Sequence, residues 1–305
     1  MSEPPPGVER EYPLARLTTI RTGGPAELFA RAGTLDELER LLGWAAAEGL
    51  EVGVIGSGSN LLVADVGVRG LVVKLDRDLS RIELQGTRIR CGGGARLPSV
   101  SAHAARAGLT GIEFGVNIPG TVGGAVRMNA NAYDGELARV LEWVDVASAS
   151  GTKRRGPERL GFAYRRSSLR SGEIVAVASL QLEPAVSEEV KATLAAMRTR
   201  RRAAQPSGIK TFGSTFKNPG AAAARGRTAG QLLDAAGCGG LRIGGAGLSA
   251  KHANFVENHG GASTADVVAV MAEARRRVQE RFGVELEPEV QALGPVPFPS
   301  DWRRA

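Results

Sequence analysis

The 305-residue sequence is poor in the residues that build metal centres and disulfide frameworks. Its two cysteines, Cys91 and Cys238, form no metal-binding or disulfide pattern, so buried thiols are the simpler interpretation. Its three histidines are too few and too scattered for a zinc site. We therefore expect no metal and no disulfide framework.

The sequence also lacks the apolar segments of membrane and exported proteins. No uninterrupted apolar run reaches the roughly 20 residues that a membrane span requires. The N-terminus, MSEPPPGVEREY, has neither the basic head nor the apolar core of a signal peptide, and its proline content predicts a disordered leader over residues 1–8. We expect a cytoplasmic protein with no membrane partner.

Acidic charge is in deficit, since the formal net charge is +7 and the pI about 9.9. Such a balance suits nucleic acid, membrane headgroups or an anionic small substrate. Aromatic residues are only 5% of the chain, and none interleaves with the basic clusters at 153–155, 198–202 and 275–277 as base stacking would need. Solvated helix faces are the simpler interpretation of these clusters. A nucleic-acid-binding module remains an alternative, and it would bind with a steep salt dependence.

One stretch lacks acidic residues altogether. From Phe114 to Tyr133 the only full charge is Arg127, and five glycines lie between Gly111 and Gly124. Such a segment leaves backbone N–H groups uncovered, and nothing in it repels an anion, so it could form a phosphate cradle. A glycine-rich turn between core elements remains the alternative for this stretch alone.

A second loop of the same kind precedes it. The β-branched run at 52–55 predicts a strand, residues 56–60 form the loop GSGSN, and an apolar segment follows at 61–64. Neither loop has the G-x-G-x-x-G pattern of a dinucleotide-binding fold. Two anion-binding loops about sixty residues apart indicate a diphosphate held between them.

These residues carry a family resemblance. VIGSGSNLLV at 54–63 and IPGTVGGAVRMNANAY at 118–133 resemble the flavin-binding cradle of the vanillyl-alcohol-oxidase type. More narrowly, the chain resembles the UDP-N-acetylenolpyruvoylglucosamine reductases. Four further motifs follow in that family's order, from about Leu17 to about Gln291: TTIRTGGPAE at 18–27, FAYRRSS at 162–168, GSTFKNP at 213–219 and LEPEV at 286–290.

The resemblance implies an α+β fold, in which a two-part flavin-binding region of the vanillyl-alcohol-oxidase type precedes a third, α+β substrate-binding domain. We expect the FAD-binding subdomains at 9–71 and 72–186, with the flavin between them. The substrate-binding domain is expected at 187–293, beginning with a linking helix over 187–204, and a tail at 294–305.

Local patterns predict the elements of this fold. The capping-box residues Thr34 and Glu37 begin a leucine-rich helix that Gly49 ends, and Thr228 begins a second such pattern. Further helices are expected near 97–107, 187–204 and 265–282. Strands are expected at 52–55, 71–74, 82–84, 89–91, 140–147 and 174–182, with a closing strand over 284–290 in which Pro288 forces an edge or a bulge.

Three motifs could carry chemistry. Arg165 offers a planar, permanently charged fork that fits a carboxylate, although on the residues alone it could be a surface arginine. Ser214, three residues before Lys217, could be a nucleophile, a proton donor or a phosphate contact, although Ser-Thr before Phe is more often a strand end. No His–Asp partnership marks it for acyl transfer. Glu287 and Glu289 could be a paired acid site or a solvated acidic strand.

The resemblance assigns roles to these motifs. Arg165, Ser214 and Glu289 match the family's catalytic residues, and Lys217 and Asn218 match positions that hold the nucleotide end of the substrate. Lys210-Thr211-Phe212 departs from the usual approach to the serine. FAD contacts are implied at Gly56, Ser57, Gly58, Ser59, Asn60, Gly120, Thr121, Val122, Gly123 and Gly124.

The implied reaction is the NADPH-driven, FAD-dependent reduction of UDP-N-acetylglucosamine enolpyruvate to UDP-N-acetylmuramate, a step of peptidoglycan precursor synthesis that supports cell-wall growth, cell shape and division. Arg165 would balance charge on the substrate carboxylate with help from Glu289, and Ser214 would deliver the proton. No tyrosine lies between Arg165 and Ser214, which indicates the shorter subclass that lacks a tyrosine-bearing loop. A flavin oxidase with the same cradle and another substrate remains the alternative.

Overall fold

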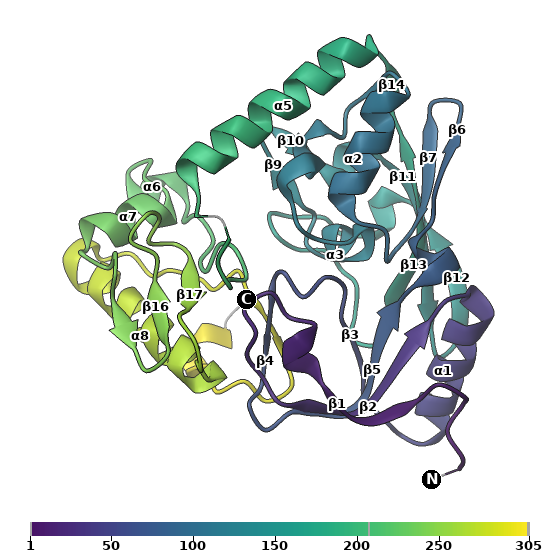
Figure 1. The fold of residues 1–305 in the computed structure, drawn as a ribbon, viewed down its shortest axis with the longest axis horizontal. Helices are drawn as coiled ribbons and strands as arrows, with labels where there is room; N and C mark the ends of the chain where they lie inside the picture. Colours follow the sequence, from purple (N-terminus) through teal and green to yellow (C-terminus); the bar gives the residue numbers. More distant parts are fainter. Residues whose placement is uncertain (1, 207, 304–305) are drawn as a thin grey trace. The chain divides into compact units, whose positions relative to one another are not determined.

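The computed structural model describes residues 2–206 and 208–303, and the chain forms two compact units (Figure 1). Unit 1 contains residues 2–12, 27–57 and 69–201, and unit 2 contains residues 13–26, 58–68 and the described residues from 202 onward. Each unit is therefore assembled from three separate segments. The three-part division at 9–71, 72–186 and 187–293 stays a prediction.

The elements of unit 1 begin with a four-stranded sheet and one helix: β1 (Glu9–Pro13), β2 (Pro25–Ala32), α1 (Leu35–Ala47), β3 (Val52–Val54) and β5 (Val68–Leu75). A five-stranded sheet follows, with strand order β12-β11-β13-β7-β6. Its strands are β6 (Ile82–Gln85), β7 (Arg88–Gly92), β11 (Leu141–Ser148), β12 (Gly151–Arg155) and β13 (Ile174–Gln181). The remaining elements are α2 (Leu97–Arg106), β8 (Leu109–Thr110), α3 (Val122–Arg127), β9 (Asn131–Ala132), β10 (Gly135–Glu136), α4 (Leu137–Val140), β14 (Glu183–Pro184) and α5 (Ser187–Ala204).

Unit 2 is built around one long helix. Its elements are β4 (Leu61–Val63), α6 (Ala221–Ala224), α7 (Ala229–Ala235), β15 (Arg242–Ile243), β16 (Ala246–Leu248), β17 (Val256–Asn258), α8 (Thr264–Phe282) and β18 (Gln291–Leu293). Strand β4 pairs in parallel with β18, and β15, β16 and β17 form an antiparallel sheet. Its core combines Ile20, Leu62 and Ala64 with residues between Phe212 and Val296.

The central strand of the five-stranded sheet, β13, explains how unit 1 is layered. All neighbouring strands of this sheet are antiparallel, and β13 is buried on both faces. Ile174 and Ala176 pack with α1 and the four-stranded sheet, whereas Val175, Ala178 and Leu180 pack with α2 and α3. The sheet is therefore covered on both faces (Figure 1). Side chains alternate along a strand, and the register shift opposite Asp145 and Val146 moves this alternation by one residue between Ala176 and Ala178.

Most predicted elements are confirmed, and the helix caps show why. Thr34 accepts a hydrogen bond from Glu37 N at 3.2 Å, but the Glu37 carboxylate turns to Gly33 N at 2.7 Å, so only half of the predicted capping box forms. At Thr228 both halves form, with Gln231. Helix α8 ends at the predicted glycine, Gly283, which has a φ of +67°.

The predicted closing strand over 284–290 is wrong. Within it only Pro288 forms a bridge, opposite Phe216, and strand β18 begins at Gln291. Proline has no N–H to donate, so it fits the one position that the flanking hydrogen bonds leave out. Those bonds are Lys217 N to Glu287 O and Glu289 N to Thr215 O, both 2.9 Å.

The solvated-face interpretation of the basic clusters is wrong for two of their members. Arg201 donates to the carbonyl of Asn117, and burial lowers its pKa. Arg275, only 17% exposed, donates from Nε to Leu286 O at 3.0 Å. Arg276 does lie on the surface, where it pairs with glutamates of its own helix.

The described residues also bear on the cysteines, on membrane spans, on metal sites and on the expected leader. Cys91 and Cys238 are both buried as predicted, and burial raises the pKa of the Cys91 thiol to about 12. Across residues 2–206 and 208–303, no helix has the length and apolar content needed to cross a membrane. In the same residues no three His, Cys, Asp or Glu side chains gather as a metal site would require. Ser2 contacts Glu48 at 2.8 Å, and the disorder expected over residues 1–8 stays a prediction.

Candidate active site

In unit 1 the two glycine loops lie in contact. The Ser57 hydroxyl donates to Pro119 O at 2.6 Å. A Cβ atom placed on Gly56 would lie 2.6 Å from Thr121 Oγ1, closer than side chains tolerate. The ammonium of Lys74, on β5, donates a hydrogen bond to the Gly56 carbonyl. Burial is the main cause that lowers the pKa of Lys74. The segments 56–57 and 119–121 therefore form one continuous backbone surface.

The second loop does not offer the amides that its composition suggested. Val122 N donates to Ala95 O at 2.9 Å, Gly123 N donates to Gly93 O at 2.8 Å, and Gly124 N donates to Thr121 Oγ1 at 3.3 Å. These bonds anchor the start of α3. The expectation of uncovered N–H groups is thus wrong at Val122, Gly123 and Gly124, and their place among FAD contacts stays a prediction.

The first loop is held through its carbonyl groups. Thr19 donates to the Gly58 carbonyl through both its N–H and its hydroxyl, at 3.0 and 3.1 Å, in unit 2. In a trans peptide the N–H points opposite to the carbonyl. Because Lys74 contacts Gly56 O, the N–H of Ser57 points away from Lys74. Because Thr19 contacts Gly58 O, the N–H of Ser59 points away from Thr19. Gly58 has a φ of +62°, and a Cβ there would lie 2.1 Å from Leu17 O. Glycine is required for this path, which suits the cradle expected for the FAD diphosphate.

Arg165 lies at the tip of a tight backbone turn in unit 1. Ala163 and Arg166 exchange two backbone hydrogen bonds, at 3.0 and 3.1 Å, with Tyr164 and Arg165 between them. Arg165 has a φ of +56°, which is unfavourable for a non-glycine residue, and its Nη1 donates to Asn131 O at 3.1 Å. A strained residue that carries a guanidinium is consistent with a functional position.

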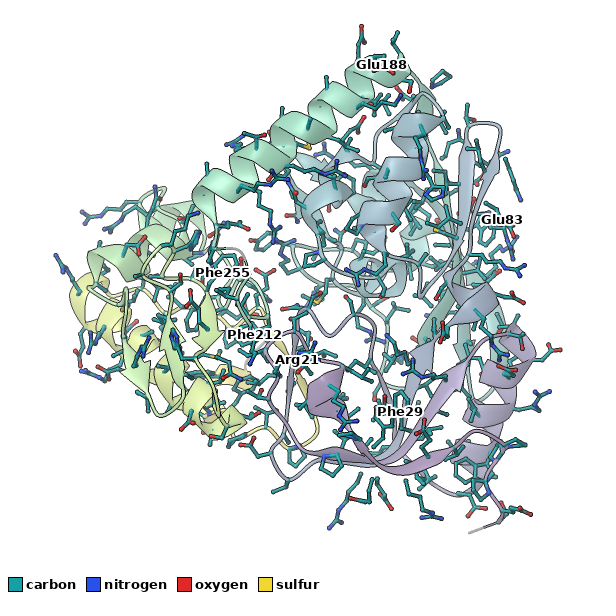
Figure 2. All side chains as sticks on the ribbon, viewed as in Figure 1. Arg21, Phe29, Glu83, Glu188, Phe212 and Phe255 are labelled. Carbon is teal, nitrogen blue, oxygen red and sulfur yellow. The ribbon has the colours of Figure 1, made fainter. Side chains whose placement is uncertain are left out.

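In unit 2 the GSTFKNP and LEPEV motifs run side by side. Phe216 bridges Pro288, and Glu289 N donates to Thr215 O at 2.9 Å. Ser214 and Glu289 are therefore on neighbouring antiparallel segments, each half-buried. Phe212 and Phe255, labelled in Figure 2, are buried beside the serine motif, and Phe255 bridges Ser214 directly.

The first loop reaches this pair of motifs. Asn60 Nδ2 donates to Glu289 O at 3.3 Å, and Gln291 N donates to Asn60 O at 3.0 Å. A Cβ on Gly213 would lie 3.9 Å from Ser59 O. The predicted FAD contacts Ser59 and Asn60 thus lie beside the predicted catalytic segments within unit 2.

The predicted substrate-binding pair has partners inside the protein. The Lys217 ammonium forms an ion pair with the Glu287 carboxylate. Glu287 therefore has a different partner from the one expected if it formed a paired acid site with Glu289. Asn218 Oδ1 accepts from Ala229 N at 3.0 Å and so caps the start of α7. Substrate contact by Lys217 and Asn218 stays a prediction.

Sequence reasoning missed the residues that support these motifs. Asn254, 4% exposed, exchanges hydrogen bonds with Phe216 N and O at 2.9 Å each and holds the serine strand from the opposite side. Asn129, fully buried, contacts the Arg165 turn. Lys74 is the one charge in the apolar run Leu71–Leu75, a signal that could have found it. Nothing in the sequence pattern around Asn254 marks it.

Comparisons with known proteins agree with this arrangement. A family model described as FAD binding domain matches residues 26–156. A model described as UDP-N-acetylenolpyruvoylglucosamine reductase, C-terminal domain, matches residues 205–293. The predicted α+β class with a flavin-binding region is confirmed.

Relatives match over nearly the whole chain. UDP-N-acetylenolpyruvoylglucosamine reductase 2 of Symbiobacterium thermophilum is 43% identical over 96% of this chain and 94% of its own. The reductase of Rubrobacter xylanophilus is 40% identical over 95% and 96%. The crystal structure of UDP-N-acetylenolpyruvylglucosamine reductase from Thermus caldophilus superposes with a TM-score of 0.81 at 39% identity, covering 94% of this chain and 99% of that one. This chain belongs to the UDP-N-acetylenolpyruvoylglucosamine reductase family.

Proposed function

We propose that the chain reduces UDP-N-acetylglucosamine enolpyruvate to UDP-N-acetylmuramate with NADPH, using Arg165, Ser214 and Glu289. The family membership supports the reaction, FAD as cofactor and NADPH as reductant. The observation that carries the assignment of Ser214 and Glu289 is the antiparallel pairing of their segments through Glu289 N and Thr215 O.

The loop 56–60 would hold the cofactor. Its amides of Ser57 and Ser59 face away from Lys74 and Thr19, which secure the intervening carbonyls. Gly120 and Thr121 extend this surface, and Val122, Gly123 and Gly124 shape it by fixing the start of α3. Hydride transfer between NADPH and the substrate is the chemistry that bound FAD supplies.

The protein's own groups handle charge and the proton. Net reduction adds a hydride to the vinyl CH2 carbon and a proton to the neighbouring carbon, which leaves the lactyl ether. Arg165 would bind the substrate carboxylate through its planar fork and stabilise negative charge there as it develops. Ser214 Oγ would give its proton to the carbon, and the Glu289 carboxyl would assist as a hydrogen-bonding partner.

Lys217 and Asn218 would contact the nucleotide end of the substrate. The ion pair between Lys217 and Glu287 would then have to exchange for a contact with the diphosphate, to which an ammonium also forms charge-assisted hydrogen bonds. We expect a small-molecule substrate and no nucleic-acid or membrane partner. A cytoplasmic location and a contribution to cell-wall growth, cell shape and division follow from the reaction proposed.

The test uses the purified yellow protein without oxygen. NADPH should bleach the flavin band, and UDP-N-acetylglucosamine enolpyruvate should then restore it with formation of UDP-N-acetylmuramate. Reduction by NADPH without reoxidation by this substrate would favour a flavin oxidase with another substrate. A protein that lacks flavin absorbance altogether would exclude both functions.

A further inference from the structure

The side chain of Asn129 is a buried amide that makes three hydrogen bonds, which use both of its N–H groups and its oxygen. It is 0% exposed and follows α3 with a φ of +40°. Its Oδ1 accepts from Ala138 N at 3.2 Å, and its Nδ2 donates to Ala163 O at 3.3 Å and to the Glu136 carboxylate. One donor faces the oxygen and two acceptors face the nitrogen, so the partners fix the orientation of the amide.

The bond to Ala163 acts directly on the turn that carries Arg165. Two backbone hydrogen bonds between Ala163 and Arg166 close this turn. Arg165 has a φ of +56°, and the left-handed conformation costs a non-glycine residue roughly 1–2 kcal/mol. So short a turn with an unfavourable residue needs contacts from outside to hold a single conformation.

The segment 127–131 supplies those contacts. Asn131 O accepts from Arg165 Nη1 at 3.1 Å, and Arg127 O accepts from the Ser167 hydroxyl at 2.8 Å. The half-buried Arg127 guanidinium donates onward to the carbonyls of residues 169, 170 and 173. Among these contacts, the Asn129 amide is the fully buried side chain that grips the backbone of the turn itself.

We propose that Asn129 is a positioning residue for the substrate half-reaction: through the Ala163 carbonyl it fixes the turn that presents the Arg165 guanidinium. The inference rests on the proposed role of Arg165. Glu136 shares in it by accepting the second N–H of the amide, which keeps the first aimed at Ala163. A displacement of about 1 Å at a group that must match a carboxylate can slow a reaction by about 100-fold.

Asn129→Asp tests this with a change of nearly equal size. It keeps the acceptor for Ala138 N but turns an oxygen toward Ala163 O and the Glu136 carboxylate. We expect the reoxidation rate with the enolpyruvyl substrate to fall at least roughly 10-fold. Bleaching by NADPH and the flavin-to-protein absorbance ratio should stay within about twofold of wild type. Equal losses in both half-reactions would overturn the inference.

Asn117→Asp is the matched control. The Asn117 amide also donates two hydrogen bonds, to Tyr133 Oη and Met197 O, both at 2.9 Å, and neither partner belongs to the Arg165 turn. Its reoxidation rate should remain near wild type. If the two variants slow reoxidation equally, loss of a hydrogen-bonded side-chain amide in general explains the effect and the assignment fails.

A double variant separates positioning from general destabilisation. If Asn129 acts through Arg165, adding Asn129→Asp to Arg165→Lys should slow reoxidation by less than about twofold further, because the coupled contribution is already lost. A multiplicative loss in the double variant would mean that Asn129 acts independently of Arg165. If Asn129→Asp does not fold, Ser167→Ala serves instead, because it removes the hydrogen bond from the Ser167 hydroxyl to Arg127 O. It should slow reoxidation by the substrate more than bleaching by NADPH. Equal slowing of the two rates would overturn the inference.

An observation that needs no turnover completes the test. The Nε–Hε resonance of Arg165, assigned by its loss in Arg165→Lys, should shift or broaden in Asn129→Asp and remain in place in Asn117→Asp. An unchanged resonance in Asn129→Asp would refute the positioning role. If the resonance shifts in Asn129→Asp but the wild-type protein does not reduce the enolpyruvyl substrate, the proposed function alone is refuted.

Discussion

The side-chain amide of Asn60 donates to the backbone carbonyl of Glu289 at 3.3 Å, and the Asn60 carbonyl accepts from Gln291 N at 3.0 Å. The bonds continue the parallel pairing of β4 with β18, which places Leu61 beside Gln291. Asn60, the last residue of the proposed FAD loop, and the proposed catalytic residue Glu289 are therefore joined by backbone and side-chain hydrogen bonds. A change at either position should affect the other.

Asn60→Asp should weaken this connection, because an oxygen would face the Glu289 carbonyl. We expect weaker FAD retention together with slower reoxidation by the enolpyruvyl substrate, each by roughly 10-fold, as for loss of one well-placed hydrogen bond. Flavin absorbance after gel filtration and stopped-flow reoxidation report the two effects. Retained flavin with wild-type reoxidation would show that Asn60 contributes to neither, and Asn117→Asp is the control for the same chemical change.

The glycines of the two loops should differ in tolerance. Gly56→Ala places a Cβ 2.6 Å from Thr121 Oγ1 and should lose FAD. Gly124→Ala places one at 3.5 Å from the same atom, an ordinary contact within α3, and should keep FAD while raising helix stability by about 0.5–1 kcal/mol. The flavin-to-protein absorbance ratio and thermal unfolding measure both. If Gly56→Ala retains flavin normally, the cradle lies elsewhere.

Arg165→Lys keeps the charge but removes the planar fork. Because a lysine cannot contact both oxygens of a carboxylate at once, reoxidation by substrate should fall much further than NADPH-driven bleaching. Rapid-mixing absorbance under anaerobic conditions measures each half-reaction. Comparable losses in the two would make Arg165 a structural residue rather than a carboxylate ligand.

Ser214→Ala should leave NADPH-driven bleaching near the wild-type rate and slow reoxidation by the roughly 10²–10⁴-fold typical of a positioned general acid. Ser214→Cys should be less impaired, since a thiol can also donate a proton. The stopped-flow flavin signal resolves both steps. Wild-type reoxidation by Ser214→Ala would move the proton donor to Glu289 or to water.

The neighbouring Thr215 provides the control, in a form that its burial dictates. Thr215 is 0% exposed, and its hydroxyl has no hydrogen-bond partner in the described part of the chain. Thr215→Val keeps the shape and removes that hydroxyl, so unfolding free energy should hold or rise by about 1 kcal/mol with little change in either half-reaction. Thr215→Ala would confuse the comparison, because it opens a cavity beneath Ser214.

Acid stability should depend on Glu173. The hydrogen bond from Arg155 is the main cause that lowers the Glu173 pKa below its ordinary 4.5, and the side chain is only 14% exposed. Because the folded pKa lies below the unfolded one, the pair stabilises the fold above the unfolded pKa, and this contribution disappears as the pH falls through the folded pKa. Glu173→Gln should lower the unfolding free energy by about 1–3 kcal/mol at neutral pH, with the difference shrinking in acid. Urea unfolding over an acidic pH series checks this; a difference independent of pH would contradict it.

Local chemistry explains why so many elements were predictable. Helix α8 carries an apolar stripe, and Gly283 follows it. Strand β13 begins with the apolar run 174–178, which favours a strand buried on both faces. These signals lie within a few residues of the structure that they dictate. The region after α8 failed, because Pro288 has its one bridge with Phe216, a residue 72 positions earlier that local periodicity cannot reveal.

The site divides in the same way. The glycine loops and the reactive side chains could be predicted from their motifs, whereas the hydrogen-bond acceptor of each backbone N–H in those loops could not. Gly123 N donates its hydrogen bond to Gly93 O, thirty residues earlier in the chain, and no local pattern indicates this partner. Asn129 and Asn254 were missed for a related reason, since a buried amide is recognised by its partners and those partners come from distant segments.

The three-segment origin of unit 2 affects how the protein is made. Its core needs Ile20, Leu62 and Ala64, and Asp65 caps the start of α8 through bonds to Thr264 N and Ala265 N at 2.8 and 3.0 Å. A fragment that begins at residue 202 would lack the strand that pairs with β18 and the cap of its longest helix. During translation, residues 13–26 and 58–68 therefore cannot pack into the core of unit 2 until α8 has been synthesised, and their apolar side chains stay exposed until then. Any chaperone dependence of this chain should be concentrated in that interval of translation.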